Sequence, residues 1–341
     1  MQCPNAIVQY LDNLIQEKVT DCYSLALYCN GNTYETHKGN VLTSNGSGIL
    51  VQPQTPFNVG SVTKVITASL AVKLAEKGLI SLDDPVSNYV SAYRYPHTIQ
   101  QLMLHTAGYA PPESLDWPTP EQMGPFRRRI YDHPVSEVAD RSAGYYTQGY
   151  TILMDIVEKA GGMSLESLGR RYLFEPLEMS NTTFETQSWE PGTYILPYDS
   201  GNNGPVKELE GLAVTGDSGL YATASDILRF GLMLLEDGQF GGRQVFSEAA
   251  AKLLKREVTN NRFNKTPALW IKGERDSYGC FGDFLSTSAM GHPGFSGCML
   301  VIDPAFKFVG VLVTNSQKLH ADWSNYRKLW NVAISCLTEK N

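Results

Sequence analysis

Apolar and polar positions follow two different periods near the start of the chain. Residues 6–18 place their apolar side chains on one face, which predicts an amphipathic helix. Residues 23–29 predict a strand, and the segment 30–32, Asn-Gly-Asn, is a turn signal. We therefore expect a second strand after this turn and an antiparallel hairpin.

A comparable pattern returns near the end of the chain. Residues 297–302 and 307–314 are mostly apolar, and they flank the segment Asp-Pro-Ala-Phe at 303–306. Two strands joined by such a turn predict another hairpin. An amphipathic helix is expected over 320–337.

A long helix is expected over 61–77. It is predicted to end at Gly78, because glycine is a common helix C-cap. Ile66, Leu70 and Leu74 would form an apolar stripe along it.

The middle of the chain, 86–209, mixes helical segments with long proline-rich loops. The predicted fold class is therefore α+β, an antiparallel sheet assembled from both ends of the chain and flanked by helices, with a mostly helical lobe inserted. We expect 1–85 and 210–341 to form the α/β lobe and 86–209 the helical lobe. The active site is expected in the cleft between them.

Composition narrows the classes of function. The 341 residues are 42% hydrophobic and 18% charged, with a formal net charge of −7. This composition is typical of a soluble packed protein, and it disfavours nucleic acid as the main partner. No apolar run approaches the length of a membrane span, and no export signal is visible, so we expect a cytoplasmic protein. The six cysteines and six histidines lack metal-ligand spacing, so no metal or cofactor is expected.

Ser61 and Lys64 are the first candidates for chemistry. Positions i and i+3 share a helix face, so Lys64 would project beside Ser61 at the start of the 61–77 helix. A serine hydroxyl needs a partner that removes its proton, and a lysine in a desolvated pocket can contribute to that. The helix N-terminus would suit a developing oxyanion. The alternative is a helix-capping serine with a solvated lysine one turn later.

Three tyrosines, Tyr145, Tyr146 and Tyr150, lie in an aromatic loop, 143–150, just before a predicted helix. A phenol aimed into a cleft beside a lysine could act as a general base. Packing in the core is the alternative for any tyrosine of this loop.

A glycine-rich segment at 290–297 precedes the last hairpin. Gly294 would let the strand approach a ligand closely, and the backbone N–H of Phe295 could serve as an oxyanion donor. His292 could contact a substrate or the group that transfers the proton. The alternative is a turn with a structural histidine.

These motifs, in this order, resemble those of the serine β-lactamase and penicillin-binding protein superfamily. The branch most similar holds class C β-lactamases, D-alanyl-D-alanine carboxypeptidases, D-aminopeptidases and related esterases. The resemblance spans about residues 20 to 335. The matching blocks are FNVGSVTK at 57–64, KGLISLDDPV at 77–86, IQQLMLHTAG at 99–108 and GLYATASD at 219–226.

The resemblance implies a β-lactamase/transpeptidase-like fold and a role for each motif residue. Ser61 would be the acylated nucleophile, Lys64 would help to activate it, and Tyr145 would be the general base. His292 takes the place of the lysine in the family's K-T-G motif. The oxyanion hole would consist of the backbone N–H groups of Ser61 and Phe295.

One position departs from the family pattern. The asparagine of the family's Y-x-N motif falls on Thr147 if Tyr145 is the aligned tyrosine, and on Gln148 if Tyr146 is. The first register is favoured because Tyr150 then also matches. Thr147 offers a short hydroxyl in place of a carboxamide, which disfavours efficient β-lactam turnover.

The resemblance thus implies a serine hydrolase that acts through a covalent acyl-enzyme on an ester or on an amide of a D-amino-acid peptide. Its partner would be a small molecule or a short peptide. A β-lactamase and a non-catalytic penicillin-binding-like sensor are the alternatives. The loops 109–135 and 185–215 are expected to line the cleft and to determine which acyl group fits.

Overall fold

A seven-stranded antiparallel sheet joins the two ends of the chain in the computed structural model, which describes residues 1–42, 48–112, 117–190, 192–196, 198–199, 204–205 and 211–338. The strand order is β10-β11-β12-β13-β1-β2-β3. The strands are β1 Cys22–Cys29, β2 Asn32–Leu42, β3 Gly48–Leu50, β10 Trp270–Ile271, β11 Met290–Pro293, β12 Met299–Asp303 and β13 Phe308–Thr314.

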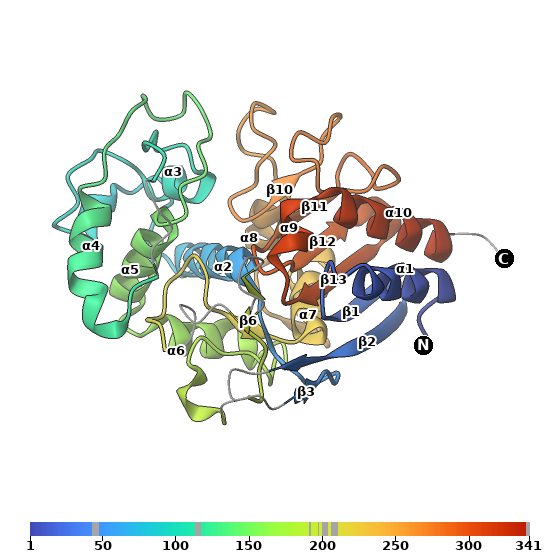
Figure 1. Ribbon diagram of the computed structural model, residues 1–341. Helices are drawn as coiled ribbons and strands as arrows, with labels where there is room; N and C mark the ends of the chain where they lie inside the picture. The colour runs from blue at the N-terminus through green and yellow to red at the C-terminus, as the bar shows by residue number, and fades with distance from the viewer. Residues whose placement is uncertain are drawn as a thin grey trace.

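Both expected hairpins are present, and they meet at the centre of the sheet. In the first hairpin Cys29 pairs with Asn32 across the turn, and in the second Asp303 pairs with Phe308. Strand β1 then pairs antiparallel with β13, so the ends of the chain share one sheet. Figure 1 shows both termini on the same side of the molecule.

Helices cover both faces of this sheet. Helix α1, Asn5–Gln16, packs with α10, Ser324–Thr338, on one face, and α7, Ala224–Leu235, packs on the other (Figure 1). The expected helix over 320–337 is interrupted, since α9, Gln317–Ala321, ends before Asp322. The carboxylate of Asp322 accepts a hydrogen bond from the Ser324 backbone N–H at 3.0 Å, so the chain restarts as a new helix there.

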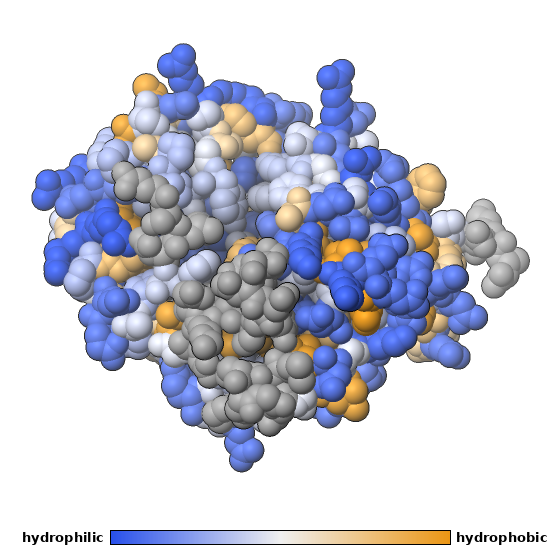
Figure 2. All heavy atoms as spheres, viewed as in Figure 1, coloured by the Kyte–Doolittle hydropathy of each residue, from blue (hydrophilic) through white to orange (hydrophobic). Residues whose placement is uncertain are grey.

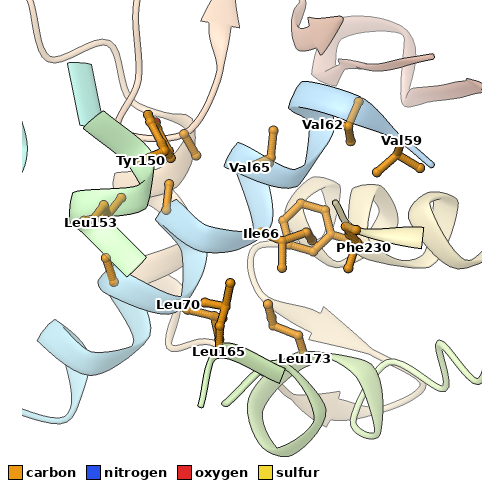
Figure 3. Packing of buried hydrophobic residues seen from close by; sticks show 14 of the residues in the cluster. Val59, Val62, Val65, Ile66, Leu70, Tyr150, Leu153, Leu165, Leu173 and Phe230 are labelled. Atoms are coloured by element: carbon orange, nitrogen blue, oxygen red, sulfur yellow. The ribbon is translucent and has the colours of Figure 1, made fainter. Parts of the chain in front are cut away.

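Helix α2, Thr63–Glu76, is buried on almost every side. Eleven of its fourteen residues are buried, so the expected stripe of Ile66, Leu70 and Leu74 is only part of what it buries. Figure 3 shows Val65, Ile66 and Leu70 packed among side chains from several other elements. Burying an aliphatic side chain contributes about 1.5–3 kcal/mol, so α2 is held firmly in the interior.

The helices of the middle segment lie on the side of α2 away from the sheet (Figure 1). The main ones are α3 Ile99–Leu104, α4 Met123–Tyr131, α5 Gly149–Gly161 and α6 Leu165–Gly169, with a π turn at Arg170–Phe174. The remaining elements are α8 Glu248–Lys255, β4 Phe57–Asn58, β5 Tyr198–Asp199, β6 Gly204–Pro205, β7 Tyr221–Ala222, β8 Gln239–Phe240, β9 Arg243–Gln244 and short 3-10 turns at Gly60–Val62, Val86–Asn88, Pro120–Gln122, Thr186–Ser188 and Pro304–Phe306.

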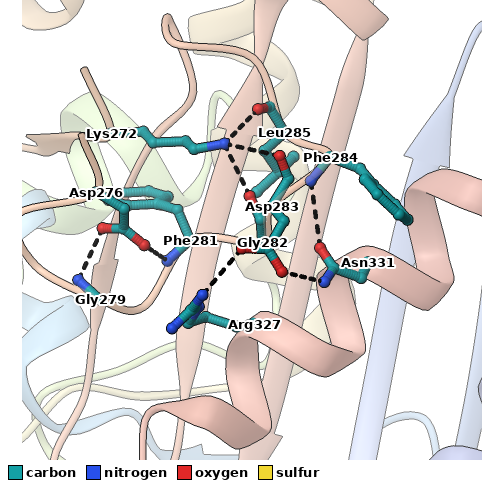
Figure 4. Close-up of polar contacts among 10 residues, drawn as sticks. All are labelled: Lys272, Asp276, Gly279, Phe281, Gly282, Asp283, Phe284, Leu285, Arg327 and Asn331. Carbon is teal, nitrogen blue, oxygen red and sulfur yellow. Dashed lines mark hydrogen bonds and ion pairs between the residues drawn. The ribbon is translucent and has the colours of Figure 1, made fainter. Parts of the chain in front are cut away.

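The segment between β10 and β11 is held by polar contacts (Figure 4). The Lys272 ammonium donates to the carbonyl oxygens of Gly282, Asp283 and Leu285, at 2.9, 3.2 and 2.5 Å. The Asp283 carboxylate in turn accepts hydrogen bonds from Arg327 and Asn331 of α10, at 2.9 and 2.7 Å. These bonds fix the irregular chain that leads into β11.

The surface in Figure 2 is mostly hydrophilic, with apolar side chains scattered over it. Five of the six cysteines are buried. Among the described residues no helix is both long and apolar enough to span a bilayer.

Candidate active site

Ser61 lies in the middle of the tight turn that precedes α2. The 3-10 turn Gly60–Val62 is held by Asn58, whose side-chain oxygen accepts a hydrogen bond from the Gly60 N–H at 3.0 Å. Gly60 has φ +54°, a left-handed conformation that favours glycine. Ser61 itself is only partly buried, so its hydroxyl sits at the surface of a rigid turn.

Lys64 reaches back to that hydroxyl from the first turn of α2. Its Nζ lies 3.0 Å from Ser61 Oγ, 2.7 Å from Thr147 Oγ1 and 2.8 Å from the Asp217 carbonyl oxygen. The side chain is fully buried. An ammonium has three protons to donate, and these three oxygens can accept all of them. The arrangement therefore holds the lysine amine against the Ser61 oxygen.

The contacts of Lys64 continue into a buried polar network. The Thr147 hydroxyl lies 3.4 Å from the Asp217 carboxylate, and the Thr151 hydroxyl donates to the same carboxylate at 3.1 Å. Asp217 is 7% exposed. Through the Thr147 hydroxyl, Asp217 belongs to the polar network that surrounds Lys64.

Asp217 and Thr151 are not identified by the sequence analysis. The signal available was the run of small polar residues at 215–219, directly before the GLYATASD block. Nothing in that run indicates a contact with Lys64, 153 positions away.

The two adjacent tyrosines point into different surroundings. The Tyr145 ring centroid lies 5.2 Å from Lys64 Nζ, and this side chain is 43% exposed. Tyr146 is 3% exposed, and its ring packs on Tyr109 and His133 at centroid distances of 4.3 and 4.6 Å. Tyr145 is therefore the tyrosine that lies beside the lysine and is open to a substrate, whereas Tyr146 belongs to the aromatic packing.

His105 supports the tyrosine loop from behind. It has a left-handed conformation, φ +58°, at the end of α3, and its Nδ1 accepts a hydrogen bond from the Tyr146 N–H at 3.3 Å. Its ring lies 4.4 Å from that of Tyr145. Burial, with the charges of Lys265 and Lys64, holds the pKa of His105 well below the usual value of 6.5. This neutral imidazole positions the loop that carries Tyr145.

His292 is also buried, and its ring is another neighbour of the Tyr145 ring. The two ring centroids are 6.3 Å apart. Burial and the nearby Lys64 charge hold the pKa of His292 well below 6.5, so the ring is neutral. Its Nδ1 lies 2.8 Å from the Pro293 carbonyl oxygen and therefore carries the proton. The other ring nitrogen, Nε2, is left as a hydrogen-bond acceptor.

Gly294 and Phe295 bring the end of β11 against the Ser61 turn. A Cβ on Gly294 would lie 2.2 Å from the Val59 carbonyl oxygen and 3.4 Å from the Ser61 nitrogen, so no larger residue fits. A Cβ on Gly60 would lie 2.9 Å from the Phe295 nitrogen. The backbone nitrogens of Ser61 and Phe295 thus belong to two segments in direct contact, as an oxyanion hole requires.

Lys265 is a second buried lysine near the site, and the sequence analysis does not identify it. It is 5% exposed, and its Nζ lies 5.5 and 5.8 Å from the ring centroids of Trp270 and Tyr278. Burial lowers its pKa from 10.5 to about 7. Trp270 separates this amine from the catalytic candidates, because its own ring lies 4.7 Å from His292 and 6.0 Å from Tyr145.

The structure therefore brings together Ser61, Lys64, Thr147, Tyr145 and His292. Phe295 and Gly294 approach from β11. A partly buried hydroxyl, a lysine amine, an accessible phenol and two backbone N–H groups are the parts that acyl transfer to serine needs. Within the described ranges, no group of three or more histidine, cysteine or acidic side chains is arranged to hold a metal ion.

Comparison with known proteins identifies the family of the chain. The sequence profile of the family described as Beta-lactamase matches residues 9–333. The chain belongs to the Beta-lactamase family.

Relatives and solved structures are similar over most of the chain. Penicillin-binding protein 4 of Amycolatopsis lactamdurans is 27% identical over 86% of this chain and 80% of its own length. The D-alanyl-D-alanine-carboxypeptidase/endopeptidase AmpH of Escherichia coli (strain K12) is 25% identical, over 74% of this chain and 66% of its own. A penicillin-binding protein homologue from Caulobacter crescentus superposes with a TM-score of 0.78 over 98% of both chains, at 18% identity. The fold is that of the β-lactamases and penicillin-binding proteins.

Proposed function

We propose that the protein is a serine hydrolase that forms a covalent acyl-enzyme at Ser61 with an ester or with an amide of a D-amino-acid peptide. The observation that carries the proposal is the position of Lys64 Nζ, 3.0 Å from Ser61 Oγ and 5.2 Å from the Tyr145 ring centroid. The Ser61 hydroxyl, the Lys64 amine and the Tyr145 ring therefore lie close together. The family's carboxypeptidase and penicillin-binding relatives support the same class of reaction.

In the acylation step, Ser61 Oγ attacks the carbonyl carbon of the substrate. Tyr145, as the general base, takes the Ser61 proton, while Lys64 holds the oxygen. The backbone N–H groups of Ser61 and Phe295 stabilise the tetrahedral oxyanion. Collapse breaks the bond to the leaving alcohol or amine, which receives the proton from Tyr145, and leaves the acyl group esterified to Ser61.

In the deacylation step, water attacks the Ser61 ester. Tyr145 takes the proton of the water and returns it to Ser61 Oγ, and the carboxylic acid leaves. His292 takes part as a neutral acceptor through Nε2, since its Nδ1–H is engaged by Pro293. It can therefore orient the phenol or a substrate N–H, but it does not supply a positive charge.

Esters without an acylamino group are favoured over β-lactams by the environment of Thr147. Its hydroxyl oxygen is already engaged by Lys64 at 2.7 Å. It offers no carboxamide that could hold the acylamino group of a β-lactam. The role of Thr147 in this proposal is to position Lys64.

Labelling tests the proposal. A fluorescent fluorophosphonate is expected to label the parent protein at one serine, with the adduct located on Ser61 by mass spectrometry. Ser61→Ala is expected to lose the label and the turnover of a p-nitrophenyl ester, while Ser180→Ala, at an exposed serine, keeps both. An adduct on a different serine would overturn the assignment. A parent protein that is folded but neither labelled nor active would favour a non-catalytic sensor.

A further inference from the structure

A pocket of about 250 Å³ opens beside the Ser61 turn. Asn58, which holds that turn, lines it, as does Ser218, the neighbour of Asp217. Trp117 forms another wall, and its ring lies 5.7 Å from that of Phe295, the proposed oxyanion residue. The pocket therefore lies next to the Ser61 turn, to the polar network around Lys64 and to the segment that carries Phe295.

Aromatic and apolar side chains form somewhat more than half of the walls, and uncharged polar side chains, those of Asn58, Thr186, Gln187, Thr215 and Ser218, form the rest. Trp189, Tyr194 and Tyr221 pack edge to face or tilted, with Tyr194 and Tyr221 centroids 5.0 Å apart. Ala213 and Val214, which lie between Tyr194 and Tyr221 in the sequence, also line the pocket. This arrangement presents π faces and aliphatic carbon to an occupant.

The described residues that line the pocket include no charged side chain. None of these lining residues is one of the buried titratable residues of the site, which are Lys64, His105, Lys265 and His292. A charged group placed here would lose its hydration without gaining an ionic partner, which is costly. Against the described lining residues, a carboxylate or an ammonium is therefore disfavoured.

We propose that this pocket binds the acyl group of the substrate, and that this group is uncharged and mainly apolar. The proposal rests on the acyl-enzyme proposed at Ser61 and names the class of acyl group that it carries. A volume of about 250 Å³ is well above that of a methyl group and somewhat below the roughly 300–1,000 Å³ of sites for drug-sized ligands. The phenylethyl part of a 3-phenylpropionyl group, which has eight carbon atoms beyond the carbonyl, suits this volume and its aromatic walls, whereas a charged acyl group finds no ionic partner among the described lining residues.

An ester series with a constant leaving group tests the proposal. The p-nitrophenyl esters of acetic, 3-phenylpropionic and succinic acid differ only in the acyl group. The parent enzyme is expected to turn over the phenylpropionyl ester with a kcat/KM at least tenfold above that of the acetyl ester, since one buried methylene alone changes this ratio about tenfold or more. The free carboxylate of the succinyl ester is expected to reduce kcat/KM below the acetyl value.

Two variants locate the effect in the pocket. Ala213→Phe fills it, and Trp189→Ala removes a wall, so each is expected to lower the phenylpropionyl-to-acetyl ratio at least fivefold. Phe284→Ala removes an aromatic ring that is 57% exposed and does not line the pocket, and it is expected to keep the parental ratio. Because the ratio is measured within each variant, partial misfolding does not imitate the result.

The outcomes separate this proposal from the one on which it rests. If the parent labels at Ser61 and hydrolyses esters without any acyl preference, or prefers the succinyl ester, the pocket proposal is wrong and the serine hydrolase stands. If Ala213→Phe and Trp189→Ala both keep the parental ratio, the acyl group binds elsewhere. If Ser61 is not labelled and no ester is cleaved, the proposed function itself fails.

Discussion

The hydroxyl oxygen of Thr147 lies 2.7 Å from Nζ of Lys64 and joins the loop before α5 to the first turn of α2. This contact places the third acceptor around the lysine ammonium. It also connects Lys64 to the carboxylate of Asp217, 3.4 Å from the same hydroxyl. The position of Lys64 beside Ser61 therefore depends on a residue from the helical segment.

Thr147→Val is expected to lower kcat/KM for a p-nitrophenyl ester by roughly ten- to hundredfold, because the lysine loses an acceptor and its geometry relaxes. Valine has nearly the same shape as threonine, so the melting temperature should change little. Thr147→Ser, which keeps the hydroxyl, is the matched control and should retain most of the activity. Equal activities for the valine and serine variants would contradict the positioning role.

The tyrosine pair provides a second prediction. Tyr145→Phe is expected to lower kcat/KM by about 10²–10⁴-fold, the usual effect of removing a general base. The ring remains, so its packing on His105 should survive. Tyr146→Phe should cost far less, because that ring is 3% exposed and packs on Tyr109 and His133. Kinetics of both variants on one ester decide the assignment, and a larger loss at Tyr146 would move the register by one residue.

The hairpins and the main helices follow from local sequence signals. The turn at 30–32 and the turn at 303–306 each join two apolar runs, and β1 and β13 lie within a few residues of their expected ranges. Turn chemistry and periodicity are properties of neighbouring residues, so they can be read without tertiary information.

The surroundings of the site could not be predicted in the same way. The carbonyl of Asp217 reaches Lys64 across 153 positions of sequence, and the buried Lys265 lies against the rings of Trp270 and Tyr278. Such contacts depend on how distant segments pack, and a lone aspartate or lysine has no local signal for them. The burial of α2 on almost every side could not be predicted either, because an apolar stripe in the sequence indicates burial of only one helix face.

The ranking of substrates is a third prediction. Nitrocefin is expected to be cleaved more slowly than a short-chain p-nitrophenyl ester, because Thr147 offers no carboxamide and neutral His292 offers no positive charge. Thr147→Asn is expected to raise the rate of β-lactam acylation relative to ester cleavage. Parallel kcat/KM measurements on nitrocefin and the ester check both statements. Faster turnover of nitrocefin by the parent protein would reverse the ranking.

Lys265 provides a prediction about stability and pH. Burial lowers its pKa from 10.5 to about 7, so between these values the unfolded chain binds a proton that the folded chain does not. This group alone makes the parent protein gain stability as pH rises through that window, by up to about 1.4 kcal/mol per pH unit. Lys265→Met keeps the aliphatic packing and lacks the buried amine. The variant is therefore expected to be more stable than the parent at pH 7, with a difference that shrinks toward pH 10.

Urea unfolding of both proteins at pH 7, 8.5 and 10 measures this difference. Lys272→Met is a control of opposite sign, because the Lys272 ammonium donates to three backbone carbonyls, and removing it should destabilise the protein at pH 7. The prediction is contradicted if Lys265→Met is less stable than the parent at pH 7, or if the difference stays constant to pH 10. Either result would show that burying the Lys265 amine does not destabilise the folded protein. In that case the contacts of Lys265 with Trp270 and Tyr278 would have to stabilise its charge by more than burial costs.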